Sequence, residues 1–173
     1  MQKLNEIERE LRRFDEKIGL EELRQLLSMA DISRADIADV CIFGEKEYRR
    51  NVIACAEAFE LLVICWKPGH VSKIHDHDGS NCAFLVIEGA AYETEFQKTS
   101  PGLATAGTTR VYHTGEICAG ADGYIHQVVN PLDSGTDLIT IHIYSPLLKM
   151  NIFEIDGGVG ELSNFPHVAA SNS

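Results

Sequence analysis

The sequence predicts a mainly β protein, a sandwich or barrel of many short strands, preceded by short N-terminal α-helices. Two observations carry this prediction. Apolar residues recur at helical spacing through the first forty or so residues, whereas from Tyr48 onward short runs rich in Val, Ile and aromatic residues alternate with Gly, Asp and Asn turns. Short strands that follow one another at regular intervals are typical of sandwiches and barrels, and not of βαβ units.

The helical part begins with two amphipathic segments. Their apolar positions follow i, i+3, i+4 spacing: Leu4, Ile7, Leu11 and Phe14, then Leu20, Leu23, Leu26 and Leu27. Gly19 separates the two segments. Ser33 is a suitable N-cap for a third short helix through Ala35 to Val40, whose early acidic residues favour the positive end of the helix dipole.

The strands are expected in eight runs: RRNVIAC, FELLVICW, CAFLVIEG, YETEF, TRVYHTG, YIHQVVN, DLITIHIY and MNIFEI. LLVICW and CAFLVI are nearly continuous apolar runs, which favours central strands. YETEF and ITIHIY alternate, which favours strands with one face in the core or a cavity. The small residues of 100–110, SPGLATAGTTR, predict a loop.

The chain is long enough for one domain, and no internal repeat or second unit is visible. We expect a helical segment over residues 1–45 packed on a β-barrel domain over 46–156. A Gly- and Ser-rich tail over 157–173 follows.

Composition narrows the possible partners and location. The net charge of -11 predicts an acidic surface, which argues against nucleic acid and anionic membranes. The chain is expected to be a monomer. The five cysteines are odd in number and scattered, so a disulfide framework is not expected. The charged N-terminus has no apolar signal region, and no run approaches the roughly 18 apolar residues of a membrane span, so we expect a cytoplasmic protein.

Two of the seven histidines suggest a metal site. His75 and His77 stand in I-H-D-H, and alternation along an extended chain directs both side chains to one face. Two imidazoles so placed can share one metal ion. Two exposed histidines in a loop would have the same spacing, so the pattern alone leaves both interpretations open.

The surroundings of these histidines resemble the two motifs of the cupin superfamily. The first motif would be Gly69, five residues, His75, one residue, His77, four residues, Cys82, six residues and Gly89; the second, Gly115, five residues, Ala121, one residue, Gly123, two residues, His126, three residues and Asn130. The resemblance implies a jelly-roll type β-barrel in which the two motifs together supply three histidine ligands. Two positions depart from it, because Cys82 replaces the usual Glu and Ala121 the usual Pro.

The replacement of Glu by Cys82 leaves several interpretations. Three neutral imidazoles would leave a divalent metal its full charge and open positions for a chelating substrate and dioxygen. Cys82 could instead pack as a small buried apolar residue. A third interpretation makes Cys82 a thiolate ligand, which together with two histidines would favour zinc.

Six segments are similar to the type I cysteine dioxygenase family, in the thiol dioxygenase branch of the cupins. They are YRRN (48–51), CWKPGH (65–70), IHDH (74–77), NC (81–82), YIHQVVN (124–130) and HIYSP (142–146). The order and intervals of these segments make a strong joint signal, although each alone is weak. The resemblance implies an Fe(II) cofactor that oxidises L-cysteine with O2 to cysteine sulfinate.

The resemblance also implies roles for single residues. His75, His77 and His126 would bind the iron, and Arg50 would bind the substrate carboxylate, with Tyr48 in the same pocket. The planar fork of an arginine suits a carboxylate. From the residues alone, Arg49 and Arg50 would more often be solvated strand charges, so only the resemblance selects Arg50.

Tyr144 matches the active-site tyrosine of that family, with His142 and Thr140 behind it. Alternation places these three side chains on one face of a strand whose other face is isoleucine. That polar face could line a cavity or face solvent. Cys82 matches a cysteine that some members link covalently to the tyrosine.

Other functions remain open at this stage. They are oxidation of 3-mercaptopropionate or cysteamine, a cupin isomerase or epimerase reaction, and non-catalytic binding of metal or a small molecule. Cysteamine would leave Arg50 without a carboxylate to bind. The resemblance also implies that relatives which prefer 3-mercaptopropionate carry Gln at the position of Arg50. No role is assigned to His70, His113 or His167.

Overall fold

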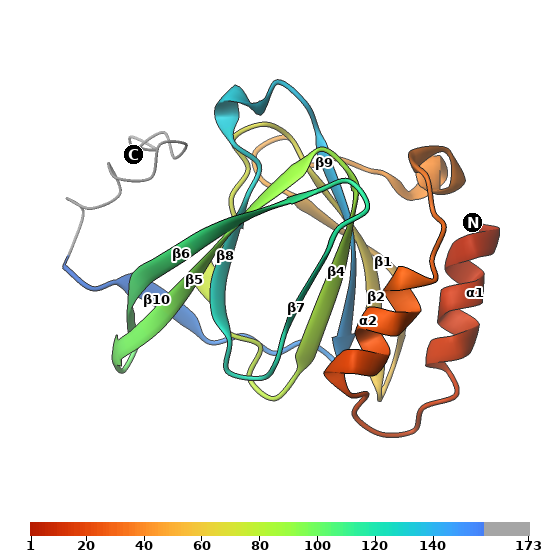
Figure 1. The fold of residues 1–173 in the computed structure, drawn as a ribbon, viewed down its shortest axis with the longest axis horizontal. Helices are drawn as coiled ribbons and strands as arrows, with labels where there is room; N and C mark the ends of the chain where they lie inside the picture. Colours follow the sequence, from red (N-terminus) through yellow and green to blue (C-terminus); the bar gives the residue numbers. More distant parts are fainter. Residues whose placement is uncertain (158–173) are drawn as a thin grey trace.

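The computed structural model describes residues 1–157 and consists of two β-sheets that face each other, with helices outside one of them (Figure 1). Most of the tail predicted over 157–173, and His167 with it, lies outside the described residues. Mainly antiparallel pairing joins the strands, and the parallel contact of β10 with β6 closes the second sheet. The predicted fold class, a β-barrel preceded by short helices, is confirmed.

The first sheet has the order β1-β2-β9-β4-β7. Its strands are β1 (Arg49–Ala56), β2 (Phe59–Trp66), β9 (Leu138–Ser145), β4 (Asn81–Glu88) and β7 (Ile117–Gly120). The second sheet has the order β10-β3-β8-β5-β6 and closes on itself. Its strands are β10 (Ile152–Ile155), β3 (Ile74–His75), β8 (Ile125–Val129), β5 (Ala90–Ser100) and β6 (Leu103–His113).

The helices cover the outer face of the first sheet (Figure 1). They are α1 (Gln2–Leu11), α2 (Leu20–Ser28) and the 3-10 helix η1 (Arg34–Val40); a second 3-10 turn, η2 (Leu132–Ser134), precedes β9. Five of the eight periodic apolar residues are buried, namely Leu4, Ile7, Leu11, Leu23 and Leu27, whereas Phe14, Leu20 and Leu26 are partly buried. Ser33 caps η1 in a capping box with Asp36, as its position predicts, but the helix is 3-10 and not α.

The inner strands of the first sheet, β2, β9 and β4, are therefore buried on both faces. Along β2, Leu61, Val63 and Cys65 pack toward the helices, while Leu62, Ile64 and Trp66 pack toward the second sheet. This double burial explains why FELLVICW and CAFLVIEG are nearly continuous apolar runs, and it confirms their prediction as central strands.

The loop predicted over residues 100–110 is wrong. β5 and β6 instead form a long hairpin that turns at Pro101 and Gly102, where Gly102 has a φ of 76°. Threonine is β-branched and suits strands even when its neighbours are small. Thr94 and Thr109 show this, because their hydroxyl groups hydrogen-bond across the hairpin at 2.8 Å.

The segment between α1 and α2 is tied to the ends of two strands of the first sheet. The hydroxyl of Ser145 in β9 accepts a hydrogen bond from the backbone N–H of Ile18 at 2.7 Å and donates to the carbonyl of Ala58 at 2.6 Å. The Asn81 side chain in β4 donates to the Ile18 carbonyl at 2.9 Å. These bonds fix the helical segment to strands that also carry candidate site residues.

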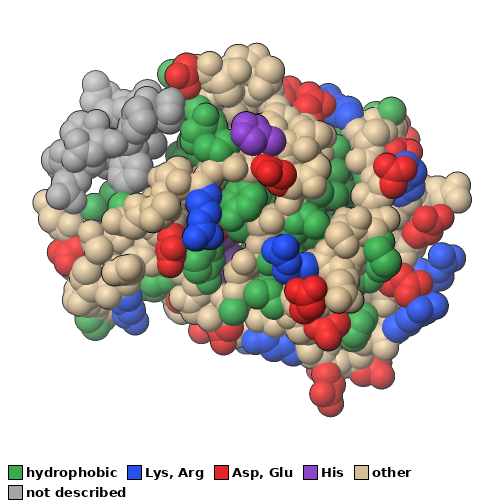
Figure 2. Space-filling model, in the orientation of Figure 1, with side chains coloured by type: hydrophobic (Ala, Val, Ile, Leu, Met, Phe, Trp, Pro, Cys, Tyr) green, Lys and Arg blue, Asp and Glu red, His purple; other side chains and the backbone are tan. Residues whose placement is uncertain are grey.

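The surface in Figure 2 mixes acidic and basic side chains without a broad cluster of Lys and Arg on this face. Within residues 1–157, no helix is long and apolar enough to cross a membrane.

Candidate metal centre

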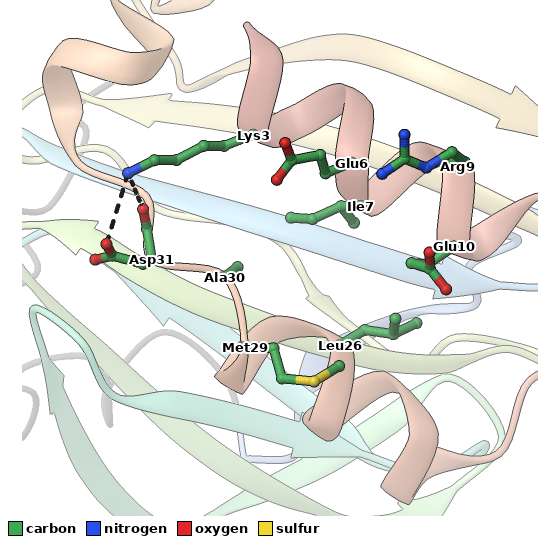
Figure 3. A pocket seen from close by; sticks show the side chains of 9 residues that line it. All are labelled: Lys3, Glu6, Ile7, Arg9, Glu10, Leu26, Met29, Ala30 and Asp31. Atoms are coloured by element: carbon green, nitrogen blue, oxygen red, sulfur yellow. Dashed lines mark hydrogen bonds and ion pairs between the residues drawn. The ribbon is translucent and has the colours of Figure 1, made fainter.

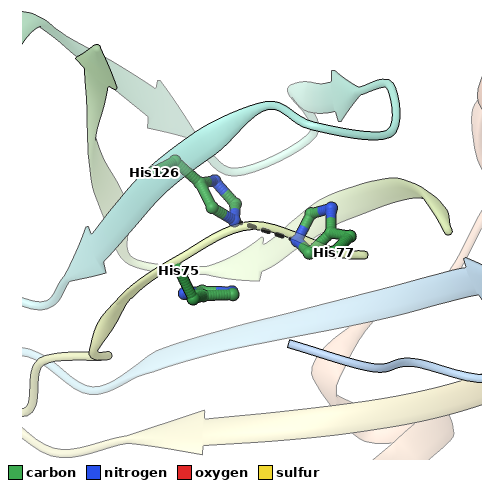
Figure 4. Close-up of side chains that lie close together, drawn as sticks. All are labelled: His75, His77 and His126. Atoms are coloured by element: carbon green, nitrogen blue, oxygen red, sulfur yellow. Dashed lines mark hydrogen bonds between the residues drawn. The ribbon is translucent and has the colours of Figure 1, made fainter. Parts of the chain in front are cut away.

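Three histidines, from two strands and the segment after one of them, lie close together (Figure 4). His75 ends β3 and is paired directly with His126 in β8, and His77 follows two residues later. One ring nitrogen of each lies within 4.8 Å of the others. All three residues are buried, with His77 at 0% exposure. In the described part of the chain, this is the one cluster of three or more His, Cys, Asp or Glu suited to hold a metal ion.

Hydrogen bonds on the far side of two rings set their tautomers. Nδ1 of His75 lies 2.8 Å from the carbonyl of Lys73, and Nδ1 of His126 lies 2.7 Å from the Glu93 carboxylate. Both partners accept, so each Nδ1 carries the proton and each Nε2 presents a lone pair. These are the nitrogen atoms that a metal requires.

The spacing also fits one metal ion. Nε2 of His126 lies 3.1 Å from Nε2 of His77. Two nitrogens that bind one metal at right angles, each about 2.1 Å from it, are about 3 Å apart. Burial, followed by the neighbouring His126, lowers the pKa of His75 to about 4 and that of His77 to about 2. Both rings are therefore neutral near pH 7, as ligands must be.

A small cavity adjoins the histidines. It is lined from both sheets by Tyr48, Arg50, Ile64, Trp66, Ser72, His75, His126, Val128, His142, Tyr144, Leu148 and Met150. Arg50 Nη2 lies 3.3 Å from Glu60 Oε2, and the guanidinium lies 5.7 Å from the centre of the Tyr144 ring. Arg49 is exposed, so the structure separates the two arginines that the sequence alone did not. The cavity thus places a guanidinium beside the histidine cluster.

A chain of hydrogen bonds runs behind the cavity along β9. Trp66 Nε1 donates to Thr140 Oγ1 at 3.1 Å, Thr140 bonds His142 Nε2 at 2.9 Å, and His142 Nδ1 bonds the Tyr144 hydroxyl at 3.2 Å. Burial raises the pKa of Tyr144 well above its usual value. It lowers the pKa of His142 well below its usual value. Tyr144 is thus a neutral phenol. The predicted alternation is observed, with the polar face turned into the cavity and not to solvent.

The sequence profile described as "Cysteine dioxygenase type I" matches residues 2–154, which is most of the chain. The chain belongs to this family. Among curated relatives, "Cysteine dioxygenase type 1" of Bos taurus is 29% identical and that of Homo sapiens 28%, each over 76% of this chain and 67% of the relative. The protein of Danio rerio with the same name is 26% identical over the same shares.

Solved structures agree on the fold. A double-stranded β-helix protein from Klebsiella pneumoniae matches with a TM-score of 0.58 at 19% identity, over 68% of this chain and 88% of that one. An oxalate oxidase matches with a TM-score of 0.52 at 15% identity, over 65% of this chain and 59% of that one. This cysteine dioxygenase family member therefore has the double-stranded β-helix, or cupin, fold.

Cys82 lies with the tyrosine and apart from the three-histidine cluster. It is paired directly with Tyr144 across β4 and β9, and the two side chains are hydrogen-bonded. Burial raises the pKa of its thiol, which disfavours a thiolate. The interpretation of Cys82 as a zinc ligand gains no support from this position.

Three contacts of the site were not expected from the sequence. Glu93 is buried against His126, Glu60 pairs with Arg50, and Trp66 donates to Thr140. A usable signal existed for Glu60, because it interrupts the otherwise apolar run FELLVICW; Glu93 follows the alternation of YETEF and is not marked by it. A charged residue on the inner face of a strand needs a partner inside.

Two of the unassigned histidines lie away from the cluster. His70 is buried, and its Nδ1 accepts the backbone N–H of Lys67 at 2.9 Å, which is a local structural contact. His113 is exposed at the end of β6.

A larger hollow lies between α1 and the end of α2 (Figure 3). Its charged side chains include Lys3, which forms ion pairs with Asp31 and Asp36 at 3.8 and 3.1 Å. The hollow contains none of the three histidines. Its size alone does not make it a functional site.

Proposed function

We propose that this protein is an iron(II)-dependent dioxygenase that oxidises L-cysteine with O2 to cysteine sulfinate. The observation that carries the proposal is the shared cavity, which places Arg50 and Tyr144 beside the three-histidine cluster. Family membership supports dioxygenase chemistry on a thiol. The choice of cysteine rests on the match between the cavity and the groups of that substrate.

His75, His77 and His126 would hold the iron. Three neutral imidazoles on one side leave open positions for a substrate that binds through two atoms and for dioxygen. Bound iron(II) would lower the pKa of the substrate thiol and activate dioxygen for transfer of both its atoms to sulfur. No separate general base is then required for the thiol.

The remaining residues bind and orient. Arg50 would take the substrate carboxylate, since a guanidinium has five N–H donors and the contact with Glu60 uses one nitrogen. The Tyr144 hydroxyl would donate a hydrogen bond toward the sulfur and oxygen. Tyr48, stacked on Trp66 with ring centres 4.2 Å apart, would form a wall that excludes water.

The carboxylate site separates the alternatives. Cysteamine lacks a carboxylate and would leave the half-buried Arg50 without its substrate partner, which disfavours this thiol. 3-Mercaptopropionate has the carboxylate but not the amine, so it would bind the metal through one atom fewer. A binding protein without catalysis would hold metal and thiol but consume no dioxygen.

One experiment tests these alternatives together. Protein loaded anaerobically with iron(II) would be analysed for bound metal, and O2 uptake would be followed with cysteine, 3-mercaptopropionate and cysteamine. We expect bound iron and uptake with cysteine foremost, with the sulfinate as product. His126→Ala should lose both iron and activity, whereas the matched change His113→Ala, at an exposed histidine, should keep both.

Two results would contradict the proposal. Absence of O2 uptake with every thiol, despite full iron loading, would favour a binding role. Loss of iron in His113→Ala but not in His126→Ala would show that the metal is bound elsewhere.

A further inference from the structure

A buried carboxylate lies directly behind one of the three histidines. Glu93, on β5, is 1% exposed, and its Oε1 accepts the Nδ1–H of His126 at 2.7 Å. A carboxylate so deep in a protein is unusual unless paired and hydrogen-bonded. Its position therefore requires a reason within the site.

The structure holds this carboxylate from several sides. Cys118 Sγ donates to the same Oε1 at 3.2 Å, and the Tyr124 hydroxyl is also hydrogen-bonded to Glu93. Behind Cys118, the hydroxyl of Tyr112 bonds the thiol, and Arg110 in turn bonds Tyr112. A carboxyl surrounded by N–H, S–H and O–H donors is suited to its acceptor-only, ionised form.

The contact has two consequences for His126. It fixes the ring with its proton on Nδ1, so that Nε2 and its lone pair face His77 and the cluster. It also raises the electron-donating strength of the imidazole, as carboxylate partners do for metal-bound histidines.

The negative charge of Glu93 gives its contact with His126 a second role. The three candidate ligands of the centre are all histidines, and none of them carries a negative charge. Glu93 supplies a negative charge one hydrogen bond further out. The charge of a divalent ion is then partly balanced within the protein before any substrate binds.

We propose that Glu93 is a positioning residue that orients His126 and provides the negative charge absent from the ligand set. The proposal rests on the three-histidine metal centre and not on the thiol reaction. It therefore stands or falls on metal binding, whatever substrate the protein oxidises.

Co²⁺ is a suitable probe, because imidazole nitrogens bind it and its paramagnetism reports on ligand protons. Its affinity would be measured by competition with a chelator for the wild-type protein and for Glu93→Gln. The substitution keeps the shape and an acceptor oxygen but removes the charge. We expect affinity to fall by roughly 10- to 100-fold.

Glu95→Gln is the matched control. Glu95 lies on the same strand, directly opposite His126 in the pairing of β5 with β8, but is only half-buried. The same charge is removed, while the hydrogen bond from Glu93 to Nδ1 remains. We expect a change of less than about threefold, because Coulomb effects of partly exposed groups are screened.

Two further measurements keep the proposal falsifiable if Glu93→Gln folds poorly. In the NMR spectrum of the Co²⁺ protein, an exchangeable, hyperfine-shifted N–H signal should move in Glu93→Gln and not in Glu95→Gln. Tyr124→Phe removes one donor to Glu93 with little change of shape, so it should weaken Co²⁺ binding in the same direction but less.

The proposal would be overturned by Co²⁺ affinities within threefold of wild type in both Glu93→Gln and Tyr124→Phe. Equal losses in Glu93→Gln and Glu95→Gln would also overturn it, since they would indicate a general charge effect. Failure of the wild-type protein to oxidise any thiol would leave these results unaffected.

Discussion

Arg50 shows how the surroundings of one side chain determine its function. Arg49 and Arg50 are adjacent and chemically identical, yet alternation along β1 exposes the first and turns the second into the cavity beside Tyr144. There, its guanidinium contacts Glu60 through one nitrogen at 3.3 Å. A substrate carboxylate would bind the remaining donors.

Arg50→Gln should therefore impair cysteine oxidation through loss of carboxylate binding. We expect kcat/KM to fall by about 30-fold, which corresponds to about 2 kcal/mol for a hydrogen-bonded charged partner. Oxidation of cysteamine, which lacks the carboxylate, should change little. Steady-state O2 uptake measures both, and Arg49→Gln is the control. An equal loss for both thiols would assign Arg50 to folding or general electrostatics.

The pairing of Cys82 with Tyr144 leads to a second prediction at this scale. The two residues face each other across β4 and β9, and their side chains are in contact. We predict a thioether bond between them in part of the molecules, formed with loss of two hydrogens during turnover with iron, cysteine and O2. Mass spectrometry and a reducing gel would detect it, since thiol reductants do not cleave a thioether.

Cys82→Ala is the control for this bond. It should remove the crosslinked species but keep iron and much of the activity, because Cys82 is not part of the three-histidine cluster. Free Cys82 and free Tyr144 after many turnovers would refute the crosslink alone. Loss of iron in Cys82→Ala would instead revive the interpretation of Cys82 as a metal ligand.

At the scale of elements, the glycines of the two motifs differ in what they permit. Gly89 connects β4 to β5 with a φ of 84°, and a Cβ there would lie 2.5 Å from the carbonyl oxygen of Asp137. Gly115 has a similar φ of 88°, but a Cβ would meet nothing within 4 Å. Both turns need a positive φ, but only the turn at Gly89 also requires that the residue has no Cβ.

Gly115→Ala should cost about 1 kcal/mol, the strain of a left-handed alanine. Gly89→Ala should cost more than about 3 kcal/mol, because backbone must also shift. Urea unfolding of the two metal-free variants would measure the difference. Equal destabilisation would mean that the backbone at Asp137, just before β9, moves without cost.

Some elements could be predicted from the sequence and others could not, for physical reasons. Periodicity identified α1, α2 and the central strands, since burial of one or both faces dictates which positions are apolar. β3 has two residues and β7 four, too few to show a period. The strand β6 was predicted to be partly a loop, because small and polar residues on its outer side resemble loop composition.

The candidate site divides in the same way. The three histidines and Tyr144 belong to motifs whose order is visible along the chain. Glu93 and Glu60 have no such motif, and their partners His126 and Arg50 lie 33 and 10 residues away in sequence. The register of β5 with β8 brings Glu93 beside His126. Arg50 and Glu60 are not opposite each other across β1 and β2, and they meet only through their long side chains.

For the whole molecule, buried histidines make stability depend on pH. Burial lowers the pKa of His75 to about 4, that of His77 to about 2, and that of His142 well below its usual value. The unfolded chain, with histidine pKa values near 6.5, therefore binds more protons below that pH than the folded protein does. Stability must fall as the pH drops.

We expect the metal-free protein to lose up to about 1.4 kcal/mol of unfolding free energy per pH unit for each of these histidines below about pH 6.5. The contribution of His75 levels off near pH 4, its folded pKa. Urea midpoints from pH 7.5 to 5.5 would show the decline. In His142→Gln, the change of unfolding free energy with pH should be smaller by the contribution of one histidine. An unchanged pH dependence in this variant, or a wild-type stability that does not vary with pH, would contradict the expectation.

The hydrogen bonds of Ile18 connect the N-terminal helical segment to the strands of the candidate site. Its N–H is held by Ser145, the residue after Tyr144, and its carbonyl by Asn81, the residue before Cys82. Ile18, outside the barrel, thus contacts β9 and β4 next to the position where Tyr144 and Cys82 face each other. Ile18 therefore connects the segment between the two helices to both of these strands, through its N–H on one side and its carbonyl on the other.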